Sequence, residues 1–95
     1  MIRFEWDEKK NRDSFRKHGV WFEEGKTIFH DPYARLIHDS DHSDEEDRFV
    51  LLGVGEKLRL LAVCHAYKKN DEVIRIFSAR KAERNEVKEY RRYLI

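Results

Sequence analysis

Three apolar segments in the second half of the chain constrain its fold more than any other feature. They are RFVLLGV, LRLLAVCHAY and EVIRIFSAR, at residues 48–54, 58–67 and 72–80. The short polar turns GEK and KKND separate them, so the segments are predicted to be neighbouring antiparallel strands. Their nearly continuous apolar texture indicates a sheet buried on both faces.

The first third of the chain is predicted to be mainly helical. Asp7 is a suitable N-cap for a helix over residues 8–18, and Gly19 suits the position just after a helix. A second short helix is expected over residues 20–31. Residues 3–6 form a short first strand or an extended lead-in.

The remaining segments complete an α+β pattern. Pro32 marks a turn, and a short strand is expected at residues 33–39. From about Ala82 onward the chain reads as a helix whose apolar side chains are spaced to face the core: Val87, Tyr90 and Leu94. We therefore expect one α+β domain over residues 1–95, with two N-terminal helices, an antiparallel sheet of about four strands and a C-terminal helix.

The composition narrows the class of protein. Ninety-five residues suffice for one small core, and no apolar stretch approaches the roughly 20 residues of a membrane span. The first residues, MIRFEWDEKKN, lack the apolar region of a signal peptide. The single cysteine, Cys64, excludes an internal disulfide and is expected to be a buried free thiol. A reducing, cytoplasmic setting is the simplest interpretation.

Cations are concentrated between residues 74 and 92, where seven Lys/Arg and three Glu give +4 in a chain whose net charge is +1. Arg80, Arg84, Lys88 and Arg92 recur every fourth residue, so on a helix they would form one ridge. Like charges at this spacing repel by roughly 0.2–0.5 kcal/mol per pair, which favours an external anion such as a nucleic acid. The alternative is a solvated helix face, with the last cations stabilised by the helix dipole.

The acidic segment DSDHSDEED, residues 39–47, offers many oxygen atoms to a metal ion. It lacks the glycine-containing twelve-residue pattern of a calcium loop and any H-x-x-x-H pair. We interpret it as a solvated loop that could attract a basic segment of a partner, and we expect no metal and no cofactor.

Several segments together resemble the BrnT toxins, a family of type II toxin–antitoxin systems. They are FEWDEKKNRDSFRKHGVWFEE, then D-x-D-H-S at residues 39–43 followed by DRFVLLG, and finally RIFSARKAERNEVKEY. The similarity runs from Phe4 to about Tyr90. Three positions differ from residues common in that family: Ser14 replaces Asn, while Trp21 and Glu83 replace helix-capping Ser or Thr. A lost cap typically costs ~1 kcal/mol unless another group replaces it.

The resemblance implies a RelE-like fold and a toxin that cleaves RNA without a metal, arresting translation. It also implies a BrnA-like antitoxin that neutralises the toxin, in a heterotetramer of two toxins and two antitoxins. DNA would be bound only indirectly, through the antitoxin. A non-catalytic RelE/ParE-like binding module, or a toxin with a target other than RNA, is the alternative.

Candidate catalytic residues follow from the chemistry that RNA cleavage requires. Arginine and lysine stabilise the charge that grows on the phosphorane, and RelE-like toxins are noted for arginines, lysines and a tyrosine. Arg75, Arg80 and Lys81 are the first candidates, with Arg59 second. Strict strand alternation would place Arg75 and Arg80 on opposite faces of the sheet unless the strand ended before Ser78.

The remaining candidates each have a structural alternative. His65 could act in acid–base catalysis, or it could be a hydrogen-bonded core residue. Tyr90 could donate a proton or stack on a base, although its spacing favours the core. Lys17 and His18 could frame the site or cap the first helix. Arg84 and Lys88 are predicted to contact the RNA.

Overall fold

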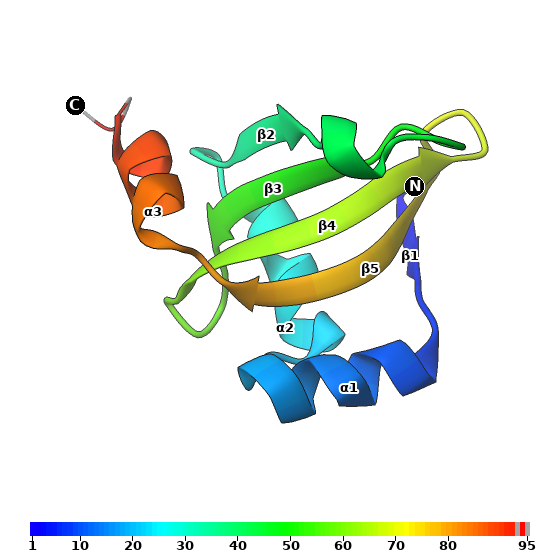
Figure 1. Ribbon diagram of the computed structural model, residues 1–95, viewed down its shortest axis with the longest axis horizontal. Coiled ribbons are helices and arrows are strands. Elements are labelled where there is room, and N and C mark those ends of the chain that lie inside the picture. Colours follow the sequence, from blue (N-terminus) through cyan, green and yellow to red (C-terminus); the bar gives the residue numbers. More distant parts are fainter. Residues whose placement is uncertain (93, 95) are drawn as a thin grey trace.

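A mixed sheet forms the centre of the structure, a computed structural model that describes residues 1–92 and 94 (Figure 1). Within those residues it has five strands in the order β1-β5-β4-β3-β2. Their bounds are Arg3–Glu5 (β1), Arg35–His38 (β2), Phe49–Val54 (β3), Leu60–Lys68 (β4) and Val73–Lys81 (β5). The run from β2 to β5 is antiparallel as predicted, but β1 adds a further, parallel strand beside β5. The expectation of about four antiparallel strands was therefore incomplete.

The first helix, α1 (Glu8–His18), forms as the sequence predicts. The Asp7 carboxylate accepts hydrogen bonds from the backbone N–H groups of Lys9 and Lys10, at 2.8 and 3.3 Å. Gly19 follows the helix with φ of 69°, and its N–H donates to the Phe15 carbonyl. Glycine adopts this left-handed conformation without steric penalty, so the helix ends at this point.

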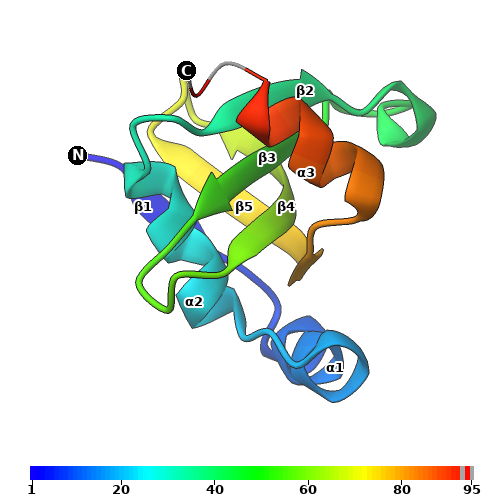
Figure 2. The ribbon, with the colours of Figure 1, turned by 90° about the vertical axis from the view of Figure 1, so that its left-hand side faces the viewer.

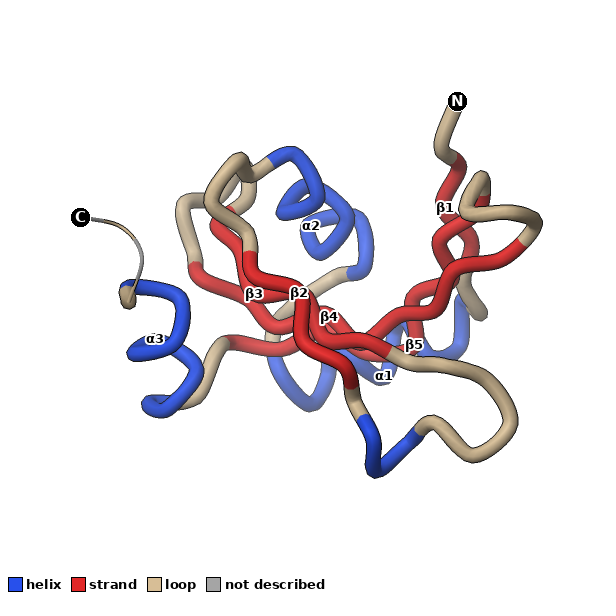
Figure 3. Tube along the Cα trace, turned by 90° about the horizontal axis from the view of Figure 1, so that it is seen from above, coloured by secondary structure: helices blue, strands red, loops and turns tan. Residues whose placement is uncertain are grey.

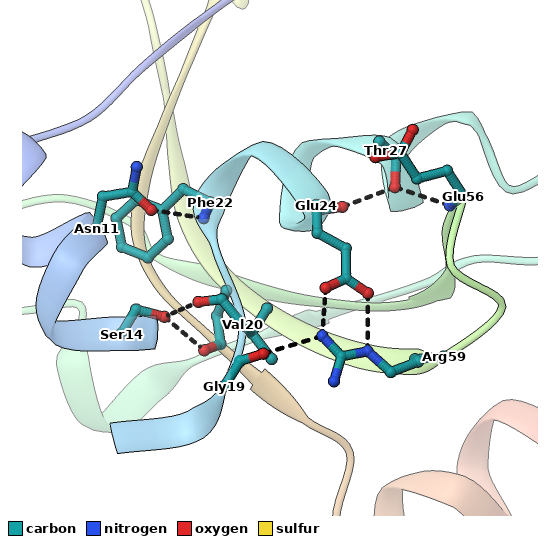
Figure 4. Close-up of polar contacts among 10 residues, drawn as sticks. Asn11, Ser14, Gly19, Val20, Phe22, Glu24, Thr27, Glu56 and Arg59 are labelled. Atoms are coloured by element: carbon teal, nitrogen blue, oxygen red, sulfur yellow. Dashed lines mark hydrogen bonds and ion pairs between the residues drawn. The ribbon is translucent and has the colours of Figure 1, made fainter. Parts of the chain in front are cut away.

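The second helix, α2 (Phe22–Thr27), is shorter than predicted and continues as a 3₁₀ turn over Ile28–His30. Trp21 gives it no side-chain cap. Instead, the buried Asn11 of α1 accepts a hydrogen bond from the Phe22 N–H at 2.7 Å (Figure 4). It also donates one to the Glu23 carboxylate at 2.9 Å. A residue of the preceding helix thus replaces the missing cap.

The two faces of the sheet are covered unequally. The helix-covered face packs Val63 and Ile76 against Phe22 and Ile28, and no residue of this set is more than slightly exposed. On the other face, here called the open face, the described residues that cover the sheet are those of α3 (Arg84–Arg91) at one end, and the loop of residues 39–48 borders it. Figures 2 and 3 show α2 on one side of the sheet and this loop on the other. The expectation of full burial on both faces was wrong for the open face, where Cys64 is only half-buried.

The last helix is tied to the sheet through a few contacts. Tyr90 packs on Leu52 and Ala62. Its hydroxyl donates to the Asp31 carboxylate, which also accepts the Val54 N–H at 2.8 Å. Leu94 is 43% exposed and does not face the core as expected, because α3 ends before it. The predicted continuation of the helix through Tyr93 and Ile95 lies outside the described residues.

Within the described residues, no helix has the length and apolar character that crossing a membrane requires.

Candidate nucleic-acid interface

A β-bulge in β5 determines which cations share the open face. Arg75 lies opposite Ala66 of β4, and Arg80 lies opposite Ala62, but the pairing shifts between them and leaves Phe77 without a partner. An unpaired extra residue resets the alternation of side chains along a strand. Arg75 and Arg80 therefore lie on the same face. The expectation that they would lie on opposite faces was wrong, because it assumed a regular strand.

Arg80 is held in one orientation by Glu86 of α3. Its Nη1 and Nη2 atoms donate to the two oxygens of that carboxylate at 2.7 and 3.0 Å. Burial alone would raise the pKa of Glu86, but the hydrogen bonds from Arg80 and from the Glu83 N–H bring it below its usual value. The hydrogen bond to Glu86 correspondingly raises the pKa of Arg80. The Nε of Arg80 makes no hydrogen bond to a described residue, so that edge of the guanidinium can still bind an anion.

A second cationic group lies toward the other end of the open face. Arg75 forms an ion pair with Glu5 of β1 at 3.1 Å, and Lys68 forms one with Glu46 of the acidic segment. The Arg48 guanidinium lies 3.9 Å from the centre of the Phe77 ring. These cations are partly neutralised within the protein, and the bulged phenylalanine lies among them.

The cations that follow Arg80 are more available. Lys81, Arg84 and Lys88 are exposed, and none forms an ion pair with a described residue. Arg80 itself belongs to β5, so the ridge predicted on the last helix begins at Arg84. Lys81 lies opposite Leu61 and is directed to the face away from Arg80, while Arg84 and Lys88 continue the basic sequence on the helix.

The end of α1 borders the same region. Lys17 and His18 line a depression of about 260 Å³ together with Phe77 and Ser78 of β5 and with Lys10, Asp13 and Ser14 of α1. The Ser14 hydroxyl donates to the carbonyls of Val20 and Ala79, at 2.7 and 2.9 Å, which fixes α1 against the edge of β5 (Figure 4). The structure therefore brings Lys17 and His18 beside the strand that carries Arg80 and Lys81.

His65 lies elsewhere, on the helix-covered face, with none of its surface exposed. Its Nδ1 is 3.0 Å from the Val63 carbonyl, its Nε2 is 3.2 Å from the Tyr67 hydroxyl, and Phe29 and Phe49 pack against its ring. Burial lowers its pKa, because the charged imidazolium would lose its hydration. The geometry is that of the alternative considered from sequence, a hydrogen-bonded core histidine.

Tyr90 is also built into the core rather than presented to solvent. Its side chain is buried, and burial, together with the hydrogen bond to Asp31, raises its pKa to about 12. A phenol in this environment holds its proton in the bond to Asp31. The structure does not bring its hydroxyl together with Arg80.

Arg59 lies apart from the other candidates, and its side chain connects the β3–β4 turn to α2 and to the end of α1. Its Nε donates to the buried Glu24 of α2 at 2.9 Å, its Nη2 contacts the same carboxylate, and Nη2 also donates to the Gly19 carbonyl at 3.0 Å (Figure 4). The bond to Glu24 raises the pKa of Arg59. These contacts link the β3–β4 turn to the helices.

Three residues near the site were not predicted from sequence: Lys10, Arg48 and Phe77. Lys10 and Arg48 both lie over the Phe77 ring, with the Lys10 Nζ 5.7 Å from its centre. The usable signal was an aromatic residue within the basic run RIFSARK, because basic residues interleaved with aromatics are typical of nucleic-acid surfaces. Arg48 and Lys10 lie far away in the sequence and gave no such signal.

Within the described residues, no group of three or more His, Cys, Asp or Glu side chains is arranged to hold a metal ion. Side chains of the acidic segment pair with neighbours instead: Asp47 with His38, Asp39 with His42, and Glu46 with Lys68.

Comparison with known proteins gives the family. The family model described as the ribonuclease toxin BrnT of type II toxin–antitoxin systems matches residues 6–86. A crystal structure of the Brucella abortus ribonuclease toxin BrnT superposes with a TM-score of 0.66 and 22% sequence identity, over 88% of this chain and 100% of that one, and so shows a shared fold. A search of curated proteins found no match. On the match to the family model, this chain belongs to the BrnT family of toxins of type II toxin–antitoxin systems.

Proposed function

We propose that this chain is a metal-independent endoribonuclease that cleaves RNA in the cytoplasm and thereby inhibits translation. The observation that carries the proposal is the cationic path from Lys17 and His18, along the end of β5, onto α3. In it Arg80 is oriented by a carboxylate, while Lys81 and Arg84 make no ion pair with a described residue. The family description of a ribonuclease toxin supports the same activity.

The proposed reaction uses the RNA's own 2′-hydroxyl as the nucleophile. The 2′ oxygen loses its proton and attacks the adjacent phosphorus, and the bond from phosphorus to the 5′ oxygen breaks as that oxygen gains a proton. The products are a 2′,3′-cyclic phosphate and a 5′-hydroxyl. The growing negative charge requires fixed cations more than it requires a metal.

In this proposal Arg80 stabilises the phosphorane, and Lys81, which follows it in β5 and is directed to the other face of the sheet, binds a neighbouring phosphate. Because Glu86 occupies the Nη1–Nη2 edge of Arg80, the Nε edge is the one that faces the phosphate. Arg84, Lys88, Lys17 and His18 bind the flanking phosphates, and Arg75 supports the open face from its pair with Glu5. His65, Tyr90 and Arg59 are given structural roles.

We further propose that a BrnA-like antitoxin covers these cations with an acidic or amphipathic segment. The complex would be a heterotetramer of two toxins and two antitoxins within a RelE-like toxin framework, with DNA bound through the antitoxin. The match to a family of type II toxins supports a partner of this kind.

A non-catalytic binding module is the second candidate. Arg59, Arg75 and Arg80 each form an ion pair with a carboxylate of the protein, which suits a stable scaffold as well as a catalyst. The observation that separates the two functions is scission of the bound RNA.

The test is incubation of purified chain with RNA in EDTA. We expect wild type to leave 5′-hydroxyl and cyclic phosphate ends. The double variant Arg80→Lys/Lys81→Ala should lose about 10²-fold in rate, the scale typical for removing a donor to a developing oxyanion. The control Lys26→Ala/Lys57→Ala removes two exposed cations outside the path and should cleave like wild type.

Circular dichroism and thermal unfolding confirm that each variant is folded. Full cleavage by the folded Arg80→Lys/Lys81→Ala protein would refute the assignment of the site. Binding of RNA by wild type without any scission would favour the binding module.

A further inference from the structure

Among the strands of the described residues, β2 forms one edge of the sheet, with no further strand beside it. β2 is the last strand of the sheet, and its register with β3 is continuous over all four residues, without a bulge. It contains neither proline nor lysine, the residues that commonly block edge pairing. Leu36 and Ile37 are 51% and 38% exposed, although they are apolar. An edge of this kind favours the addition of another strand.

The backbone groups available on this edge can be identified. The Asp39 N–H donates to the Arg48 carbonyl at 2.8 Å, so this pair is hydrogen-bonded. In an antiparallel ladder such pairs alternate, so Ile37 and Arg35 also bond to β3, while Leu36 and His38 direct their N–H and C=O groups outward. No hydrogen bond from elsewhere in the described chain engages the backbone of Leu36 or His38.

We propose that β2 pairs with β2 of a second copy of this chain, antiparallel and about a two-fold axis at Ile37. In this register Leu36 of each copy forms a hydrogen-bonded pair with His38 of the other, so every outward N–H and C=O group of the two residues finds a partner. Arg35 of each copy, which is paired with Glu89 of its own chain, then lies opposite Asp39 of the other copy, which is paired there with His42. Opposite charges facing each other across strands stabilise their pairing.

Two other registers also pair outward-facing residues of the two strands, with the two-fold axis at Leu36 or at His38, but they fit less well. An axis at Leu36 places His38 opposite Ala34, whose N–H already donates to the Asp31 carbonyl. An axis at His38 places Leu36 opposite Ser40, which belongs to the 3₁₀ turn after β2. Neither brings Arg35 opposite Asp39.

Charges beyond β2 favour the same partner. At the Arg35 end lies α3, bound through an ion pair from Arg35 to Glu89. It carries three cations, Arg84, Lys88 and Arg91, and is followed by Arg92, against two carboxylates, Glu86 and Glu89. At the other end the acidic segment carries six carboxylates: Asp39, Asp41, Asp44, Glu45, Glu46 and Asp47. A two-fold axis perpendicular to the sheet keeps both open faces on one side and places the cationic α3 of each copy toward the acidic segment of the other. Figure 2 shows α3 and the acidic segment on the same side of the sheet.

A pair of cysteine variants tests the register. In Ile37→Cys, the two thiols face each other across a non-hydrogen-bonded pair, at a spacing that a disulfide can bridge. Leu36→Cys is the matched control on the same strand, because its thiols would be diagonal neighbours roughly 7–8 Å apart, too far for a disulfide. Under mild oxidation we expect a covalent dimer from Ile37→Cys, and little from Leu36→Cys or from wild type with its native Cys64.

Sedimentation of the uncrosslinked protein is the second measurement. We expect a reversible dimer whose dissociation constant rises with salt and rises about tenfold or more in Ile37→Lys, which places two like charges opposite each other. Leu36→Pro should weaken the dimer to a similar extent, because proline lacks the outward N–H at this position while the hydrogen bonds from β2 to β3 remain. A monomeric wild type, or equal crosslinking of the two cysteine variants, would overturn the proposal. A monomer would leave the edge to a strand of a different protein.

Discussion

His65 shows how one residue's surroundings decide between a catalytic and a structural role. Its spacing with Leu61, Val63 and Tyr67 places it on one face of a strand, and the sequence left open whether it acts in acid–base catalysis or is a hydrogen-bonded core residue. Its ring is enclosed by aromatic rings on the helix-covered face and hydrogen-bonded at both nitrogens. Periodicity can group residues on a face, but it cannot say which face receives the helices.

The lowered pKa of His65 predicts a specific pH dependence of stability. The folded protein keeps the imidazole neutral, whereas the unfolded chain protonates it below about pH 6.5, so the free energy of unfolding should fall as the solution is acidified. His65→Gln should remove this contribution, about 1 kcal/mol between pH 6.5 and 5.5. Urea unfolding at both pH values measures it.

The exposed His18→Gln is the control and should keep the wild-type pH dependence. An unchanged pH dependence in His65→Gln would contradict the structural assignment. The same variant should also cleave RNA at the wild-type rate per folded molecule, and loss of that rate would return His65 to the list of catalytic residues.

At the scale of elements, capping and turn chemistry were readable from the sequence, and long-range contacts were not. Asp7 and Gly19 delimit α1 where the sequence placed them, and the polar turns separate β3, β4 and β5 as expected. The parallel pairing of β1 with β5 joins residues about seventy positions apart and has no local signal. The bulge at Phe77 likewise has no glycine or proline to announce it.

The start of α2 provides a test of a cap supplied from another helix. Asn11→Ala leaves the buried Phe22 N–H without its acceptor, so we expect a loss of roughly 1–3 kcal/mol in the free energy of unfolding. Asn85→Ala, at an exposed position of α3, is the matched control and should change stability by less than about 0.5 kcal/mol. Denaturant unfolding distinguishes them, and equal losses would show that the Asn11 contacts contribute little.

At the scale of the whole molecule, positive and negative charges are concentrated in two different regions. A net charge of +1 conceals the acidic segment of residues 39–47 and the cationic path that ends on α3. The sequence revealed both regions. It did not show that Arg75 pairs with Glu5, seventy positions away in β1, or that Arg80 pairs with Glu86 of the helix that follows β5.

The salt dependence of RNA binding tests the path as a unit. If Lys17, Arg80, Lys81, Arg84 and Lys88 each neutralise one phosphate, the logarithm of the binding constant should fall with the logarithm of salt with a slope of about −3.5. Lys81→Ala/Arg84→Ala should reduce the magnitude of that slope by about 1.4. RNA with 2′-O-methyl groups prevents cleavage during the measurement. Lys26→Ala/Lys57→Ala should keep the wild-type slope, and an unchanged slope in the first variant would exclude those two contacts.

The unpaired Phe77 also determines which interval in the sequence places two arginines on the same face of β5. In a regular strand Phe77 would lie opposite Cys64, and every side chain after it would change sides: Arg80 would turn toward the helices, and Lys81 would replace it above the sheet. An odd interval of five positions between Arg75 and Arg80 thus places two like side chains on one surface. A comparison of distant relatives that counted only even intervals would miss the pair, whereas a relative that lacked Phe77 would keep its second arginine opposite Ala62 at an even interval.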